Sequence, residues 1–236
     1  MLDTIILLTS TVEQPVLAAT LQGHNPLLTV YTVATLAELM ALAPDVLRRA
    51  RLIAFCTDVV VPARLLDALG FGAYNFHPGS PRYPGWAPAQ FAIYEQAKEF
   101  GATAHVMIAE VDAGPIVDVE MFDVAPGITL LGLGVLAYTH TAKLFWRLAW
   151  TMALQREVLP QTSIRWSGEK CTRRRYAAMR DIPDGISPEE RDRRTDAFAG
   201  AVNDAIVAAQ AAAQADPAPS ETGVIAAPAK ASSQAA

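Results

Sequence analysis

Three side chains suited to proton transfer and charge stabilisation lie near the middle of the chain, beside turn-forming residues. Asn75 and His77 stand two residues apart before a loop rich in proline and glycine, and Asp112 precedes an Ala-Gly-Pro turn. An imidazole can exchange a proton near neutral pH, an amide can donate hydrogen bonds, and a carboxylate can hold a charged imidazole. A set of these three types could serve acid–base chemistry.

Taken singly, each of these residues also has a structural interpretation. A histidine after a strand is most often structural, an asparagine there favours a turn, and an aspartate before Ala-Gly-Pro can begin one. His105 falls in a strand pattern, where a core or pocket-wall position is expected. Residue type alone therefore favours the structural interpretation of each side chain, and only their combination favours chemistry.

The segments before these residues predict an α/β fold. Compact apolar or β-branched runs predict strands at residues 4–10, 27–33, 51–56 and 73–77. Helical spacing predicts helices at residues 12–21, 34–50 with a break at Pro44, and 61–70. This alternation is typical of a Rossmann-like, mostly parallel sheet with helices on both faces. Ligands of such sheets bind beyond the carboxyl ends of the strands, so chemistry is expected from residue 74 onward.

The second half of the chain adds further elements and a change of composition. We predict a helix at Phe91–Phe100 with Gly101 after its end, strands within 102–108 and 111–124, and a long helix at 128–153. Beyond Pro160 the chain becomes charged, which predicts a small helical C-terminal extension. The expected parts are a catalytic domain at residues 1–155, the extension at 156–205, and an Ala/Pro/Ser-rich tail at 206–236 that should be disordered.

Several linked motifs follow one another between Tyr74 and Phe122. They are Asn-x-His-Pro at a strand end, a Pro/Gly loop, a helix, a Thr-x-His strand ending at His105, and Asp-x-Gly-Pro-Ile from Asp112 to Ile116. In order and spacing this stretch resembles the catalytic core of the formyltetrahydrofolate-dependent formyltransferases. That superfamily includes methionyl-tRNA, glycinamide ribonucleotide and sugar-nucleotide N-formyltransferases. The resemblance extends more loosely over residues 4–153 and implies a formyltransferase-type fold.

The resemblance also implies a mechanism. A formyl group would pass from 10-formyltetrahydrofolate to an amine through a tetrahedral intermediate, whose oxygen becomes negative. Asn75 and protonated His77 would face that oxygen, and His77 would exchange the protons of the attacking and leaving nitrogens. Asp112 would hold the imidazolium and position a water for proton relay.

The resemblance further implies a folate site at the loop after the third strand. The residues assigned to it are Cys56, Thr57, Asp58, Val59, Val60, Val61, His105 and Gly114. Most contacts there would come from the backbone, which tolerates many side chains, and the three valines also fit an ordinary core. No metal is expected.

The loop after His77 and the C-terminal part bear on the substrate. Pro84 stands where relatives commonly carry an arginine, so no acceptor contact is assigned to that position. The basic cluster Arg173–Arg175 fits either a solvated helix face or a phosphate contact. The stretch after residue 155 is too short for the C-terminal β-barrel of the tRNA enzyme, which favours a small amine, such as an amino sugar nucleotide, over tRNA.

The composition of the chain indicates which classes of partner it could bind and in which cell compartment it could work. A net charge of −5 argues against a nucleic-acid partner. The two cysteines lie far apart and indicate neither a disulfide framework nor a zinc site, which fits a cytoplasmic protein. Charges within the apolar stretch 130–150 argue against a membrane span. That helix should either pack internally or form the contact of a homodimer.

Three functions stay open at this point. The leading one is an N-formyltransferase acting on a small amine. The second is a formyltetrahydrofolate hydrolase, because the Gly-Ala-Thr-Ala-His spelling at Gly101–His105 is shared with that relative. The third is a catalytically degenerate homologue that binds folate or a partner protein.

Overall fold

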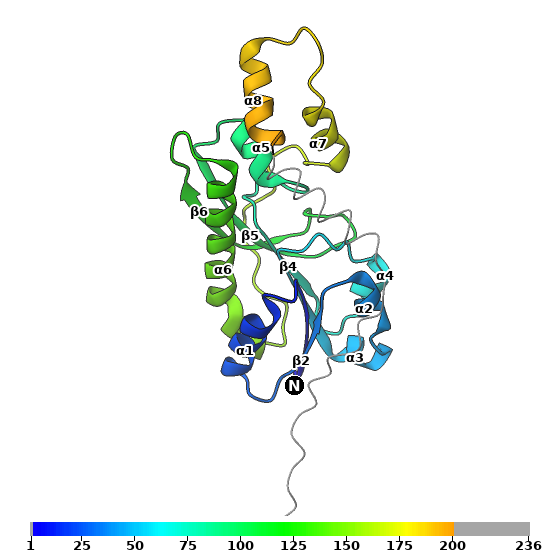
Figure 1. Ribbon diagram of the computed structural model, residues 1–236. Helices are drawn as coiled ribbons and strands as arrows, with labels where there is room; N and C mark the ends of the chain where they lie inside the picture. Colours follow the sequence, from blue (N-terminus) through cyan, green and yellow to red (C-terminus); the bar gives the residue numbers. More distant parts are fainter. Residues whose placement is uncertain (1, 201–236) are drawn as a thin grey trace, which may run out of the picture.

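Six strands form one sheet in the order β2-β1-β3-β4-β5-β6, within a computed structural model that describes residues 2–200 (Figure 1). The strands are β1 (Thr4–Leu8), β2 (Thr29–Val33), β3 (Ala50–Phe55), β4 (Ala73–His77), β5 (Glu99–Val106) and β6 (Ile116–Asp123). Neighbours from β2 to β4 run parallel, whereas β5 pairs antiparallel with both β4 and β6. The predicted mostly parallel sheet is confirmed, with an antiparallel edge.

Helices cover both faces of the sheet, as predicted. They are α1 (Gln14–His24), α2 (Leu36–Ala41), α3 (Pro44–Arg49), α4 (Ala63–Asp67), α5 (Pro88–Tyr94), α6 (Leu130–Leu154), α7 (Arg173–Arg180) and α8 (Pro188–Phe198). Helices α1 and α6 lie on one face, and α2, α3 and α4 lie on the other (Figure 1). Alternate residues of β1 serve the two cores: Ile5 packs under α1 and α6, while Ile6 faces the opposite layer.

The helix predicted at Phe91–Phe100 was wrong in its second half, because α5 ends at Tyr94 and β5 begins at Glu99. Gln96 adopts a left-handed φ of 52°, and the amides of Gln96 and Ala97 donate back to carbonyls of the last helical turn. This is a Schellman ending with glutamine in the position that glycine usually takes. Without a glycine or proline to mark the end, the sequence pattern placed it too late.

The helical extension predicted in the charged region contains α7 and α8, which pack beside α5 (Figure 1). The Phe198 ring lies 5.1 Å from Phe91 and 5.6 Å from Tyr176, centroid to centroid. Ser187 caps the start of α8, since its hydroxyl accepts from the Glu190 amide, while the Glu190 carboxylate accepts from Tyr94 and Arg194. The tail predicted at 206–236 lies outside the described residues, and the domain boundaries stay predictions.

One side of α6 is buried and the other is apolar but exposed. Side chains exposed by 40–62% along this helix are Leu131, Val135, Tyr138, Trp146, Trp150 and Leu154. We expected this helix either to pack internally or to form a homodimer contact. Within the described chain, internal packing does not cover these exposed residues. The homodimer contact stays a prediction. No helix within residues 2–200 has the length and apolarity needed to cross a membrane.

A buried arginine joins the sheet to the end of α6. Arg51 is 0% exposed and donates hydrogen bonds to the carbonyls of Phe71 (3.2 Å), Met152 (2.8 Å) and Glu157 (3.0 Å). Its guanidinium also lies 5.3 Å from the Tyr74 ring centroid. Burial lowers the pKa of Arg51, against the raising influence of Tyr74 and Glu157. The group is held by carbonyl oxygens, which satisfy its donors without a paired carboxylate.

Replacement of this arginine should destabilise the fold. In Arg51→Met, three carbonyl oxygens lose a charged donor, and we expect the free energy of unfolding to fall by about 2–4 kcal/mol. Urea denaturation followed by circular dichroism measures the change. Arg49→Met is the matched control, because the Arg49 side chain is 61% exposed. Equal stability of the two variants would contradict a structural role for Arg51.

Candidate active site

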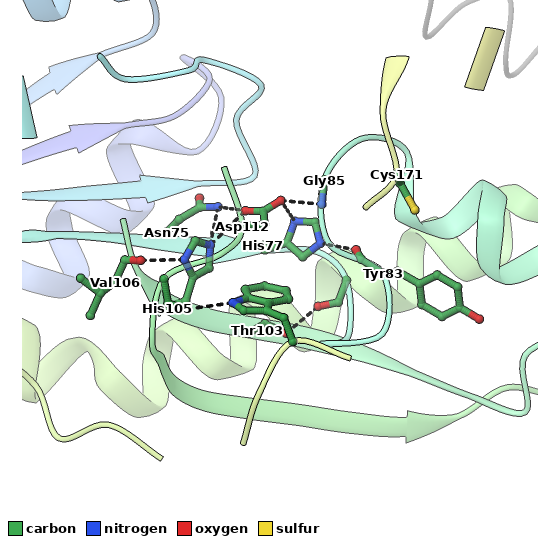
Figure 2. Close-up of polar contacts among 12 residues, drawn as sticks. Asn75, His77, Tyr83, Gly85, Thr103, His105, Val106, Asp112 and Cys171 are labelled. Atoms are coloured by element: carbon green, nitrogen blue, oxygen red, sulfur yellow. Dashed lines mark hydrogen bonds and ion pairs between the residues drawn. The ribbon is translucent and has the colours of Figure 1, made fainter. Parts of the chain in front are cut away.

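The predicted catalytic residues come together where β4 and β5 pair (Figure 2). Asn75 and His77 are two residues apart on β4 and therefore lie on the same face of the sheet. The antiparallel register sets His105 of β5 opposite Asn75, and a register shift at Ala104/His105 interrupts the pairing with β6. Such irregularities often re-aim a side chain beside a site. Asp112 arrives from the loop between β5 and β6.

The Asp112 carboxylate is the centre of the cluster. Its Oδ1 accepts from His105 Nε2 at 3.0 Å and from Asn75 Nδ2 at 3.3 Å. Its Oδ2 accepts from the Gly85 amide at 2.8 Å and lies 3.4 Å from His77 Nδ1. The side chain is 5% exposed. A buried carboxylate is tolerable because these donors satisfy both oxygens.

Electrostatics favour the charged form of this carboxylate. Burial by itself raises the pKa of Asp112, but the positive charge of His77, the hydrogen bond from His105 and the amide of Gly85 outweigh it. The net result is a pKa far below the usual value for an aspartate. Asp112 is therefore ionised whenever the neighbouring histidines carry protons.

In each of the two histidines, both ring nitrogens lie near an acceptor oxygen. His105 Nδ1 lies 2.9 Å from the Val106 carbonyl and its Nε2 faces Asp112. His77 Nε2 lies 2.9 Å from the Tyr83 carbonyl and its Nδ1 faces Asp112. A neutral imidazole has a single N–H, so only the doubly protonated ring can donate in both directions. The two rings thus flank one carboxylate, and each sets its remaining nitrogen against a backbone carbonyl.

Asn75 keeps hydrogen-bonding capacity for a ligand. The carboxylate 3.3 Å away requires that the NH₂ side of the amide face Asp112. His105 Nε2, 3.2 Å from the same nitrogen, cannot accept while it donates to Asp112, so one Asn75 hydrogen is not used there. Among the described residues, the buried Oδ1 of Asn75 also has no donor. An unpaired buried acceptor in a cavity wall is a natural place for a ligand donor.

A cavity of about 560 Å³ opens over this cluster. Every predicted site residue except Gly114 lines it: Cys56, Thr57, Asp58, Val59, Val60, Val61, Asn75, His77, His105 and Asp112. Gly114 instead packs against β5, where an added Cβ would lie 1.9 Å from the Val106 carbonyl oxygen. Its role in the structure is to let the turn approach the strand.

The predicted folate loop presents backbone more than reactive side chains. Burial raises the pKa of the Cys56 thiol far above its usual value, more than the charge of Glu13 does, and a hydrogen bond with Thr141 opposes both. A thiol in this state is inert as a nucleophile. Cys56, Ala87 and Asp112 all line the cavity with left-handed φ values of 45°, 53° and 46°. Strain of this kind in residues other than glycine gathers at functional sites.

Sequence reasoning missed the wall that the C-terminal part contributes. Trp166 donates its indole N–H to the Gly114 carbonyl at 2.8 Å. Lys170 pairs with Glu110 at 3.2 Å, and Lys170 and Arg173 line the cavity. These contacts span fifty residues or more, and no local pattern signals them.

The arginines of the basic cluster Arg173–Arg175 lie in different surroundings. Arg173 lies 4.4 Å from the Trp86 ring centroid and 3.8 Å from Asp58, at the cavity. Arg175 instead lies over Phe91, at 4.5 Å. Each of these two side chains therefore makes a specific contact with an aromatic ring.

No group of three or more His, Cys, Asp or Glu within residues 2–200 is arranged to hold a metal ion.

Comparison with known proteins shows the family. Residues 14–134, just over half of the chain, match the model of the formyl transferase family, and the chain belongs to that family. A methionyl-tRNA formyltransferase of Thermosynechococcus vestitus is 42% identical over 59 residues, which are 24% of this chain and 18% of that enzyme. The matching segment is thus a small part of the curated relative's length.

Solved structures share the fold. A sugar N-formyltransferase from a Shewanella species superposes with a TM-score of 0.68 at 14% identity, over 82% of this chain and 87% of that one. The N-formyltransferase of Helicobacter canadensis, solved with folinic acid and dTDP-3-aminofucose, gives 0.61 at 16% identity, over 84% and 79%. Since these identities are low, the likeness shows the formyltransferase fold.

The lowered pKa of Asp112 predicts how the stability of the protein varies with pH. A carboxyl whose folded pKa is lowered stabilises the protein above its unfolded pKa, about 3.9, and loses that contribution as the pH falls toward the folded value. We expect Asp112→Asn to be clearly less stable than wild type at pH 5.5, and the gap to narrow below about pH 4. Urea unfolding across this range measures it, with the exposed Asp123→Asn as control. A gap independent of pH would contradict the electrostatic account.

Proposed function

We propose that this protein transfers a formyl group from 10-formyltetrahydrofolate to the amine of a small substrate. The observation that carries the proposal is the buried cluster of Asn75, His77, His105 and Asp112 at the floor of a cavity of about 560 Å³. Membership of the formyl transferase family supports it. The cluster offers what formyl transfer requires, namely hydrogen-bond donors for an oxyanion and a group that exchanges protons.

The formyl oxygen becomes negative when the amine attacks the formyl carbon. The Asn75 hydrogen that Asp112 does not accept donates to this oxygen, and a protonated His77 adds positive charge beside it. Because the cluster is buried, its charges act with little screening by solvent. The donors are held by the fold before the reaction begins, so little reorganisation is needed.

Two protons move while one carbon–nitrogen bond replaces another. The attacking amine forms its bond to the formyl carbon and gives up a proton, while the folate N10 takes a proton as its bond to that carbon breaks. His77 supplies the proton to N10 and regains one from the amine. Because its two ring nitrogens face Asp112 and the Tyr83 carbonyl, both transfers pass through a water. The products are a formamide and tetrahydrofolate, and the cluster ends with the charge it had at the start.

The donor fits the wall formed by residues 56–61, which combines backbone with the apolar side chains of Val59 and Val61. The Helicobacter canadensis structure, solved with folinic acid, supports a folate as the formyl donor. The acceptor is proposed to be an amino sugar nucleotide, supported by the Shewanella and Helicobacter canadensis relatives of the same fold. Free Cys56 and Cys171 fit a reducing compartment, and we propose the cytoplasm.

Substitution of the oxyanion donor tests the catalytic assignment. In Asn75→Ala we expect kcat for formyl transfer to fall about 100–1000-fold, because one donor to the oxyanion is removed. Calorimetric binding of 5-formyltetrahydrofolate should persist, which separates catalysis from donor binding. His24→Ala, an exposed residue at the end of α1, is the control and should keep full activity. Unchanged turnover in Asn75→Ala would refute the role.

Product analysis separates transfer from hydrolysis. With 10-formyltetrahydrofolate and no amine, we expect formate release to be negligible, and a panel of amino sugar nucleotides should restore turnover. Rapid formate release without an amine would favour the hydrolase, in which water takes the place of the amine. Failure to bind 5-formyltetrahydrofolate at all would favour the degenerate homologue.

A further inference from the structure

The segment between α6 and α7 runs alongside the loop that follows β4. Backbone hydrogen bonds join Ser167 N to Pro81 O at 3.0 Å and Cys171 N to Pro84 O at 2.8 Å, and Trp86 N returns to Cys171 O. Between them, Gly168 approaches Arg82 so closely that an added Cβ would overlap its carbonyl. Residues 166–171 therefore hold the loop 81–86 from the outside.

That loop supplies two of the contacts that fix the catalytic cluster. The Tyr83 carbonyl accepts from His77 Nε2 at 2.9 Å, and the Gly85 amide donates to Asp112 Oδ2 at 2.8 Å (Figure 2). Gly85 has a φ of 93°, and a Cβ there would meet the Cys171 carbonyl at 2.3 Å. The position of the loop, and with it the geometry of the cluster, depends on the segment that packs against it.

Trp166 begins this segment and also contacts the site directly. Its ring centroid lies 5.1 Å from that of His105 and 5.9 Å from that of His77, with interplanar angles of 82° and 69°. Its indole N–H is fixed by the Gly114 carbonyl at 2.8 Å, two residues beyond Asp112. One aromatic ring is thus anchored beside the Asp112 turn and packs against both histidines.

We propose that Trp166 is a positioning residue that holds His77 and His105 on the two oxygens of Asp112. An imidazole that rotates about its Cβ–Cγ bond loses both of its nitrogen contacts at once, and a bulky ring packed against it prevents this rotation. Trp166 acts through the histidines and need not touch the substrate. Only the kinetic consequence rests on the proposed function, since the ring orientation is a property of the protein alone.

Histidine NMR tests the orientation without any substrate. The chain has four histidines, so ¹⁵N–¹H spectra of the imidazole nitrogens contain four ring systems, with His24 and His140 as internal references. In Trp166→Ala we expect the His77 and His105 signals to shift and broaden as the rings gain alternative orientations. In Trp166→Phe, which keeps an aromatic ring, the His77 and His105 signals should lie close to their wild-type positions. Wild-type positions of both signals in Trp166→Ala would overturn the proposal.

Two further variants keep the outcome decisive. Trp146→Ala removes a tryptophan that is 52% exposed on α6, and it should leave the His77 and His105 signals unchanged. Trp166→Leu keeps apolar volume without the ring and serves if the alanine variant does not fold. If Trp166→Leu gave wild-type histidine signals, the aromatic ring would not be needed, and the proposal would be wrong.

Kinetics provide the second readout. We expect kcat to fall about 10–100-fold in Trp166→Ala, since small misplacement of catalytic groups has costs of that order, while binding of 5-formyltetrahydrofolate stays within a factor of about two. Loss of binding with unchanged kcat would instead assign Trp166 to the cavity wall and overturn the positioning role. If the wild type transfers no formyl group, the proposed function fails, but the NMR result still decides the role of Trp166.

Discussion

The buried carboxylate of Asp112 is the constraint on which the site depends. A charge with 5% exposure is stable only while donors surround it, and here the donors come from three parts of the chain. β4 supplies Asn75 and His77, β5 supplies His105, and the loop after β4 supplies the Gly85 amide. Any change that moves one of these parts leaves part of a buried charge unsatisfied. The site is therefore held together by the same interactions that give it its chemistry.

The sheet topology explains why the cluster forms at this place. Parallel strands β1, β3 and β4 bring the loop at residues 56–61 beside the end of β4. The antiparallel pairing of β5 with β4 then places His105 directly opposite Asn75. The loop at residues 56–61 thus follows a strand of the parallel part of the sheet, His105 comes from the antiparallel part, and both line the same cavity.

The sequence allowed the prediction of features that are local along the chain. Asn75 and His77 lie within one strand end, Asp112 lies in one turn, and hydrophobic patterns located the four strands before residue 78. The end of α5 was missed because Gln96 takes a left-handed conformation that its residue type does not announce. Trp166 was missed for a different reason: its partners are 52 residues or more away in sequence, and only the folded chain brings them together.

The two histidines also show why one carboxylate is enough. Each ring sets one nitrogen toward the Asp112 carboxylate and the other toward a backbone carbonyl, that of Tyr83 for His77 and that of Val106 for His105. In the proposed transfer, an oxyanion formed beside Asn75 is attracted by a protonated imidazole, and the attraction is strong because the site is buried. A second carboxylate would cancel the attraction before the reaction began. An arrangement of two imidazoles around one carboxylate, with the carbonyl oxygens of Val106 and Tyr83 as the other acceptors, is therefore suited to the proposed transition state, which becomes negative.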